Sequence, residues 1–156
     1  MEKTNVMRLL TATKIDFLAH EYNPDLTDGN AVAAALSQNP DHVFKTLVTQ
    51  GATPRTHYVF CVPVNRTLHL KKAARAVGEK SVEMLKQRDL LGLTGYVHGG
   101  CSPIGMKKKF VTVIDASALR FETIVISAGR RGFQVELAPG TLGEYVQANF
   151  EDIIEN

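Results

Sequence analysis

The sequence has only two cysteines, no tryptophan and no long hydrophobic run. Cys61 and Cys101 are too few for a disulfide framework, and neither has a second potential ligand at metal-binding spacing. No stretch approaches the roughly 18 consecutive apolar residues of a membrane span. Charged residues interrupt positions 1–17, which therefore lack the apolar region of a secretory signal. We expect a cytoplasmic protein with reduced thiols and no membrane association.

Signatures of cofactor binding are also missing. The five histidines form no HxxH, HxxxH or HExxH spacing, so the sequence gives metal catalysis no support. A glycine-containing stretch at 98–109 lacks the spacing of a Walker loop or a dinucleotide-binding fingerprint. We therefore expect neither a metal nor another cofactor.

What is present fits a single globular domain over residues 1–156, because 44% of the chain is apolar and 22% is charged. The net charge of +2 conceals an uneven distribution. Residues 66–109 contain ten Lys or Arg and three Asp or Glu, whereas the rest of the chain has an acidic excess. A local basic excess can attract phosphates and a polyanion, although basic runs more often form solvated surface.

Residue patterning predicts an α+β domain. Amphipathic and Ala-rich runs favour helices, and β-branched runs bounded by turn residues favour strands. The strand-rich middle between helical ends favours a mixed or antiparallel, partly barrel-like sheet flanked by helices. Helices are expected at residues 4–13, 31–36, 71–77, 86–91 and 141–148, and strands at 15–22, 43–49, 57–64, 81–85, 123–128 and 132–137, with 43–64 forming a hairpin.

Lys45 is the first candidate for chemistry. It lies within an apolar strand, where alternation places it on the same face as Val43 and Leu47. If that face is the core, the charge is costly and persists only when it is paired or functional. On a solvated edge the same lysine would only discourage aggregation, which is the more common role.

The stretch at 98–109 is the second candidate. Consecutive Gly99 and Gly100 let backbone N–H groups approach a ligand, and the stretch ends in three lysines, although glycine clusters also mark simple turns. Cys101 could be a nucleophile with a lowered thiol pKa, but no histidine can be assigned as its base, so we favour a passive small residue. Cys61 is expected to be a core thiol.

Several segments together resemble the YbaK family of cysteinyl-tRNA(Pro) deacylases. The likeness covers residues 4–142 in order and is carried by residues 44–48, 70–72, 78–84, 94–109 and 125–132. It implies a free-standing editing domain, similar to the insertion domain of bacterial prolyl-tRNA synthetases, that clears tRNA(Pro) mischarged with cysteine. The implied fold is a mixed sheet closing toward a barrel. The implied partners are aminoacyl-tRNA and, in a ternary complex, prolyl-tRNA synthetase.

The resemblance also assigns roles to single residues. Gln134 departs from it, because some relatives carry an acidic residue there, and a site role for Gln134 is therefore open. The implied catalytic residues are Lys45, Gly99 and Gly100, the substrate-binding residues are Tyr22, Phe44, Thr46, Ser127 and Gly129, and the tRNA-binding residues are Lys71, Lys72, Lys107, Lys108 and Lys109.

In the chemistry implied by the resemblance, the thiol of the substrate attacks its own ester carbonyl. A pocket of proline size discriminates poorly against cysteine by size, so reactivity must supply the selectivity. A thiol is partly ionised at neutral pH and a serine hydroxyl is not. Two alternatives stay open. The protein could deacylate another mischarged tRNA, such as alanyl-tRNA or cysteinyl-tRNA(Cys), or it could be a non-catalytic module that binds tRNA or a synthetase.

Overall fold

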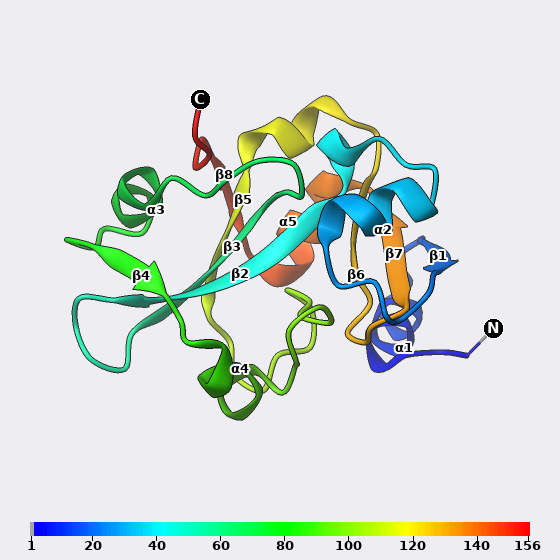
Figure 1. Cartoon of the computed structure of the whole chain (residues 1–156), viewed down its shortest axis with the longest axis horizontal. Coiled ribbons are helices and arrows are strands. Elements are labelled where there is room, and N and C mark those ends of the chain that lie inside the picture. The colour runs from blue at the N-terminus through cyan, green and yellow to red at the C-terminus, as the bar shows by residue number, and fades with distance from the viewer. Residues whose placement is uncertain (1) are drawn as a thin grey trace.

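The computed structural model describes residues 2–156, which form two β-sheets with five α-helices packed around them (Figure 1). Two short 3₁₀ segments, η1 and η2, complete this part of the chain. In chain order the elements are α1 (Asn5–Ala12), β1 (Leu18–Glu21), α2 (Gly29–Ala35), η1 (Pro40–His42), β2 (Phe44–Gly51), β3 (His57–Pro63), α3 (Leu70–Ala76), β4 (Val82–Met84), α4 (Gln87–Thr94), β5 (Val111–Asp115), η2 (Ala116–Arg120), β6 (Ile124–Ser127), β7 (Phe133–Leu137), α5 (Pro139–Val146) and β8 (Asn149–Glu151).

The larger sheet has the order β4-β2-β3-β5-β8, and the smaller sheet has the order β1-β7-β6. β2 pairs antiparallel with β3 and β4, whereas β5 and β8 are added in parallel. A parallel bridge between Val43 and Val125 links the two sheets beside the start of β2. The predicted α+β class, mixed sheet and hairpin are therefore confirmed. Within residues 2–156 the two sheets do not close into a barrel.

Helix ends follow the capping residues in the sequence. The Thr4 hydroxyl accepts a hydrogen bond from the Met7 N–H at 3.3 Å and begins α1, as the pattern predicts. The Asp28 carboxylate accepts from the Ala31 N–H at 3.1 Å and begins α2 two residues earlier than predicted. These caps satisfy backbone donors that would otherwise lack partners at the first turn. Asp28 thereby acquires a fixed position, which matters for the site described below.

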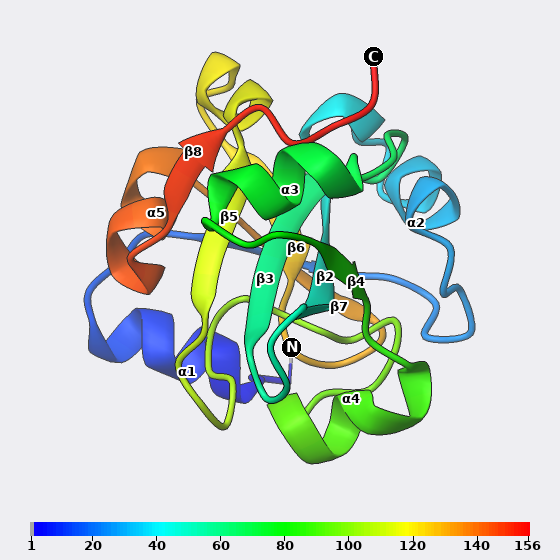
Figure 2. The ribbon, with the colours of Figure 1, turned by 90° about the vertical axis from the view of Figure 1, so that its left-hand side faces the viewer.

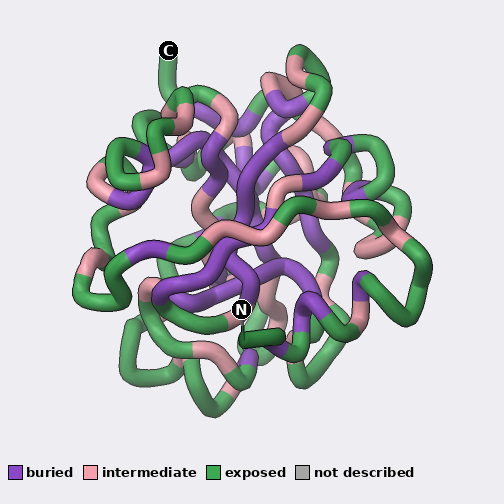
Figure 3. Tube along the Cα trace, turned by 90° about the vertical axis from the view of Figure 1, so that its right-hand side faces the viewer, coloured by how far each residue is buried: buried purple, intermediate pink, exposed green. Residues whose placement is uncertain are grey.

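The two larger buried clusters account for most of the core. The main one lies between the sheets, α1 and α5, and includes Leu10, Phe44, Ile126 and Leu142. A smaller one forms where α3 lies across β3 and β5, and it includes Phe60 (Figure 2). Burying each such large apolar side chain contributes about 1.5–3 kcal/mol. Buried segments run through the middle of the molecule and exposed ones form its outer loops (Figure 3).

Four elements lie outside the predicted ones, namely η1, β5, η2 and β8. β5 pairs in parallel with β3, whose residues are about fifty positions away, and β8 pairs in parallel with β5. Parallel partners are joined by long crossovers, so no local turn signal announces them. Across residues 2–156 no helix is both long and apolar enough to cross a bilayer.

Candidate functional site

One cavity of about 490 Å³ collects most of the predicted catalytic and substrate-binding residues. It lies between the first half of β2, the start of α2, the end of β6 and the loop at 98–101. Its volume is in the range of small-molecule sites. Six predicted residues line it, namely Tyr22, Phe44, Lys45, Thr46, Gly99 and Ser127. The other lining residues include Thr27, Asp28, Leu90, His98, Cys101 and Gln134.

Lys45 is a half-buried cation with no internal partner. Its position near the start of β2, opposite Val62 of β3, places its backbone within the paired ladder of the two strands. Among residues 2–156 the Lys45 ammonium makes no hydrogen bond and no ion pair. Burial lowers the pKa of Lys45, and the nearby Asp28 carboxylate opposes that shift. A desolvated ammonium of this kind is available to an anionic or carbonyl group of a ligand.

The loop at 97–100 is a β-turn, and Gly99 and Gly100 have different places in it. The Gly100 N–H donates to the Val97 carbonyl at 3.0 Å, and Gly99 has φ +87°. A positive φ at the third position with this hydrogen bond is a type II turn, which favours glycine there. Gly100 packs so closely that an added Cβ would lie 3.2 Å from the Arg131 backbone nitrogen. Gly99 therefore faces the cavity, whereas Gly100 is not among its lining residues.

Ser127 and Gln134 are cross-strand partners in the smaller sheet. The Ser127 hydroxyl oxygen accepts from the Gly129 N–H at 3.1 Å, which leaves the hydroxyl hydrogen free to donate. Gly129 does not line the cavity and packs against Tyr96 instead. Within the described residues the Gln134 side-chain oxygen is buried and has no hydrogen-bond partner. A buried acceptor without a partner is costly, so it marks a place where a ligand donor fits.

The two thiols differ in access but not in ionisation. Cys101 lines the cavity, whereas Cys61 is fully buried and has the Thr46 hydroxyl 3.8 Å from its sulfur. Burial raises the pKa of each thiol to about 12. Both therefore remain protonated at neutral pH, and the thiol form is a poor nucleophile. The burial of Cys61 confirms that it is a core thiol, and the passive role of Cys101 stays a prediction.

The predicted tRNA-binding lysines lie away from the cavity lining and divide into two groups. Lys107, Lys108 and Lys109 are exposed, and Lys108 and Lys109 line a separate cavity of about 320 Å³. Lys71 is exposed on α3. The Lys72 ammonium, however, points toward residues 152–154 of the C-terminal segment and contacts them.

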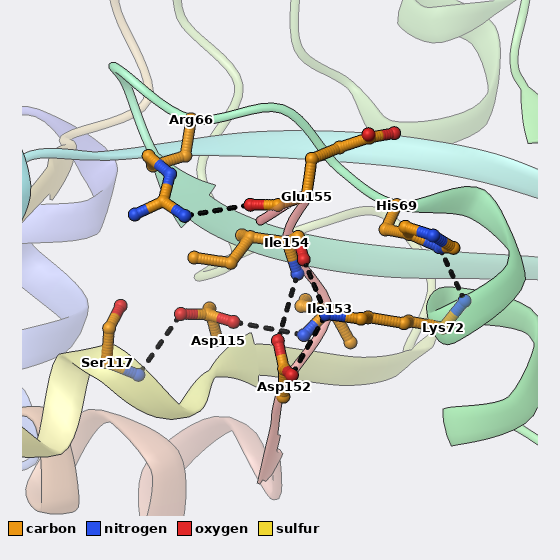
Figure 4. A network of polar contacts seen from close by, with 9 residues as sticks. All are labelled: Arg66, His69, Lys72, Asp115, Ser117, Asp152, Ile153, Ile154 and Glu155. Carbon is orange, nitrogen blue, oxygen red and sulfur yellow. Dashed lines mark hydrogen bonds and ion pairs between the residues drawn. The ribbon is translucent and has the colours of Figure 1, made fainter.

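The network around Lys72 holds the end of the chain (Figure 4). The Lys72 ammonium contacts the Asp152 carboxylate at 3.0 Å and the Ile154 carbonyl at 2.8 Å. Asp115 accepts from the Ile153 N–H at 3.0 Å, and Arg66 donates to the Glu155 carbonyl at 2.8 Å. These bonds tie residues 152–155 to α3 and β5 and leave Lys72 little freedom to meet a phosphate.

Sequence reasoning did not name several lining residues, Asp28 and Leu90 among them, as part of the site, and it left a role for Gln134 open. An Asp before an Ala-rich run is a helix-capping signal, which could have placed Asp28. Gln134 pairs with Ser127 across the β6–β7 hairpin, whose two strands the sequence predicts, but the strand pattern does not show that the Gln134 oxygen is buried without a partner. No group of three or more His, Cys, Asp or Glu side chains in residues 2–156 is arranged to hold a metal ion.

The chain matches known proteins over nearly its whole length. Residues 23–144 match the family model described as an aminoacyl-tRNA editing domain. The chain is 42% identical over 154 residues to EbsC of Enterococcus faecalis, described as a candidate Cys-tRNA(Pro)/Cys-tRNA(Cys) deacylase. That alignment covers 97% of this chain and 93% of EbsC.

Two crystal structures share the fold at lower sequence identity. The hypothetical protein APE2540 has a TM-score of 0.89 at 22% identity, with 97% of this chain and 100% of that chain covered. A candidate trans-editing enzyme for prolyl-tRNA synthetase has a TM-score of 0.84 at 21% identity, with 100% of each chain covered. These likenesses show the fold, and the family model and EbsC add the sequence relationship. The chain therefore belongs to the aminoacyl-tRNA editing domain family, as its motifs indicate.

Proposed function

We propose that this protein is a trans-editing deacylase that removes cysteine from mischarged tRNA(Pro). The observation that carries the proposal is the unpaired, half-buried Lys45 ammonium in a cavity that also presents the Gly99 backbone and a buried free acceptor on Gln134. The relationship to EbsC supports cysteinyl-tRNA as the substrate class.

The proposed reaction needs no nucleophile from the enzyme. The substrate sulfur attacks its own ester carbonyl carbon, a C–S bond forms, and the bond to the ribose oxygen breaks. The thiol proton goes to solvent, and the released ribose oxygen takes up a proton, so the products are a cyclic thiolactone and free tRNA. The raised pKa of Cys101, about 12, supports a passive role for the one thiol that lines the cavity.

Each group in the cavity has a part in this reaction. Lys45 holds the carbonyl or the 3′ end of the tRNA in reacting geometry, and the Gly99 N–H stabilises the developing oxyanion. We assign the oxyanion contact to Gly99 alone, because the Gly100 N–H already closes the turn. Gly100 instead lets the loop approach the turn at 130–131.

The orphan acceptor of Gln134 suits the α-ammonium of the aminoacyl group. An aminoacyl ester carries this one strong cationic donor next to its carbonyl, and a buried amide oxygen can accept from it. Ser127, directly opposite Gln134, can donate its hydroxyl hydrogen to the same ligand. Tyr22 and Phe44, both buried, contribute apolar surface to the cavity wall.

Recognition of the tRNA is assigned to the exposed lysines. Lys71, Lys107, Lys108 and Lys109 are exposed, and the one contact recorded for their ammonium groups within residues 2–156 is a long one, 3.4 Å from Lys107 to the Gly92 carbonyl, so all four can meet backbone phosphates. Neutralising the three consecutive lysines together should weaken binding and reduce the salt dependence of the binding constant. Prolyl-tRNA synthetase enters this proposal as a partner that could deliver the mischarged tRNA.

A panel of mischarged tRNAs tests the proposal. We expect rapid deacylation of cysteinyl-tRNA(Pro) and little of alanyl-tRNA. Because the name of EbsC includes cysteinyl-tRNA(Cys), that tRNA is the second candidate substrate and belongs in the panel. Release of alanine at the rate of cysteine would favour a deacylase that acts without the substrate thiol. Binding of tRNA without any deacylation would identify a non-catalytic module.

A further inference from the structure

The turn at 97–100 can exist in two forms that differ in one peptide group. Type I and type II turns share the closing hydrogen bond and differ by a flip of the central peptide, here His98–Gly99. The closing bond from Gly100 to Val97 is compatible with both forms. Something other than that bond must therefore decide which way the His98 carbonyl and the Gly99 N–H point.

Arg131 contacts this central peptide from the outside. Its Nε–H donates to the His98 carbonyl at 2.8 Å. The contact is close, because a Cβ added at Gly99 would lie 3.1 Å from the same Nε. Arg131 comes from the tight turn between β6 and β7, which packs against Gly100. It does not line the 490 Å³ cavity, whereas His98 and Gly99 do.

The direction of the Gly99 N–H follows from peptide geometry. The His98–Gly99 peptide is trans, so its carbonyl and its N–H point in opposite directions. With the carbonyl fixed toward Arg131, the N–H is directed away from Arg131, and Gly99 itself lines the cavity. Among residues 2–156 the Gly99 N–H has no hydrogen-bond partner, so it is free for a ligand.

We propose that Arg131 is a positioning residue whose Nε–H holds the His98–Gly99 peptide in its type II orientation and thereby presents the Gly99 N–H to the substrate carbonyl. The consequence for rate rests on the proposed function. The orientation of the peptide does not, since it follows from contacts within the protein. The exposed guanidinium could instead act as a charge that binds tRNA phosphate, and the two roles predict different variants to fail.

Three substitutions separate the donor from the charge. In Arg131→Gln the side-chain nitrogen stands the same number of bonds from Cα as Nε, so the donor is kept and the charge is lost. In Arg131→Met a methyl group takes that place, so donor and charge are both lost. Arg131→Lys keeps the charge but places a methylene there. We expect kcat to fall about tenfold or more in the Arg131→Met and Arg131→Lys variants, with KM changed little. In the Arg131→Gln variant kcat should be close to that of the wild type.

A second measurement reads the turn itself, without activity. In a type II turn the His98 Hα lies close to the Gly99 amide hydrogen, and in a type I turn it does not. The NMR cross-peak between them should be strong in the wild type and in Arg131→Gln, and weak in Arg131→Met and Arg131→Lys.

The outcomes are distinguishable. An unchanged cross-peak in the folded Met variant would overturn the proposal, whatever the activity. If Arg131→Gln lost activity mainly through a higher KM and Arg131→Lys did not, the proposal would also be overturned. That result would assign Arg131 to phosphate binding. A weakened cross-peak with normal deacylation would support the role of Arg131 in the turn and would contradict the oxyanion role of Gly99 in the proposed function.

Discussion

Lys45 lines the cavity, and Lys72 lies in the polar network at the C-terminal segment. The two lysines differ in whether other residues of the protein contact their ammonium groups. Lys45 is half-buried with no internal partner, whereas Lys72 contacts both Asp152 and the Ile154 carbonyl. The same contrast holds for their surroundings. The cavity contains the unpartnered Gln134 oxygen and the free Gly99 N–H, while Asp115 near Lys72 bonds two backbone N–H groups.

The contrast separates groups that await a ligand from groups that stabilise the fold. A polar group left without a partner in a closed region costs folding free energy, and such groups persist where they serve binding or catalysis. Polar groups that are fully paired hold the chain. The same substitution should therefore have opposite consequences at the two lysines.

Lys45→Met should give the largest effect on activity. It removes the ammonium and keeps most of the aliphatic stem, so single-turnover deacylation should fall at least about 100-fold. The free energy of unfolding should change by less than about 1 kcal/mol, because no internal partner is lost. Rapid-quench kinetics and urea unfolding measure the two quantities. Near-normal turnover in the folded variant would remove Lys45 from the reaction.

Gln134→Leu should lower activity and raise stability together. The lost contact to the substrate ammonium predicts a decrease of about 10-fold or more in kcat/KM. Removing a buried acceptor without a partner should stabilise the fold by up to about 1 kcal/mol. The matched variant Gln134→Glu keeps an acceptor and should retain more activity than Leu. Equal losses in the two variants would exclude the acceptor role.

Lys72→Met should lower stability and spare activity. It removes the contacts to Asp152 and to the Ile154 carbonyl, which are partly screened by solvent, so we expect a loss of about 1 kcal/mol. Thermal unfolding measures the loss of stability, and deacylation kinetics measure the activity that should be retained. An increased Kd for tRNA in a variant of normal stability would return Lys72 to the tRNA-binding role that the sequence resemblance implies.

The smallest effect is the pH dependence of the Asp152 contact. The hydrogen bond from Lys72 lowers the pKa of Asp152 below its usual value of 3.8. A carboxyl with a lowered pKa stabilises the folded state above pH 3.8 and loses that contribution as the pH falls through the lowered pKa. Asp152→Asn should therefore destabilise the protein by well under 1 kcal/mol at pH 7 and by less near pH 3. An equal loss at both pH values would show that the charge of Asp152 does not matter.

Local sequence signals predict the parts of this molecule that depend on neighbours in the chain. The strands that became β2 and β3 alternate and are joined by a short turn, and the Thr4 cap precedes an amphipathic run. Parallel pairing of β5 and β8 depends on partners far away in sequence, so it was not predictable.

The same limit applies to the site. Lys45, Gly99 and Ser127 could be named from motifs, but the motifs could not show that Lys72 pairs with Asp152, eighty residues later. Nor could they separate Gly99 from Gly100, because the role of each depends on which N–H closes the turn. The contact from Arg131 to His98 likewise exists only in the folded chain.

The central claim is that the substrate supplies its own nucleophile. The most direct test compares single-turnover deacylation of cysteinyl-tRNA(Pro) and seryl-tRNA(Pro), which differ by one atom, while the released amino-acid product is captured and identified. The account predicts much faster release from the cysteinyl ester, with a thiolactone appearing before free cysteine. Equal rates for the two esters, with free amino acid as the first product, would contradict it and indicate attack by water.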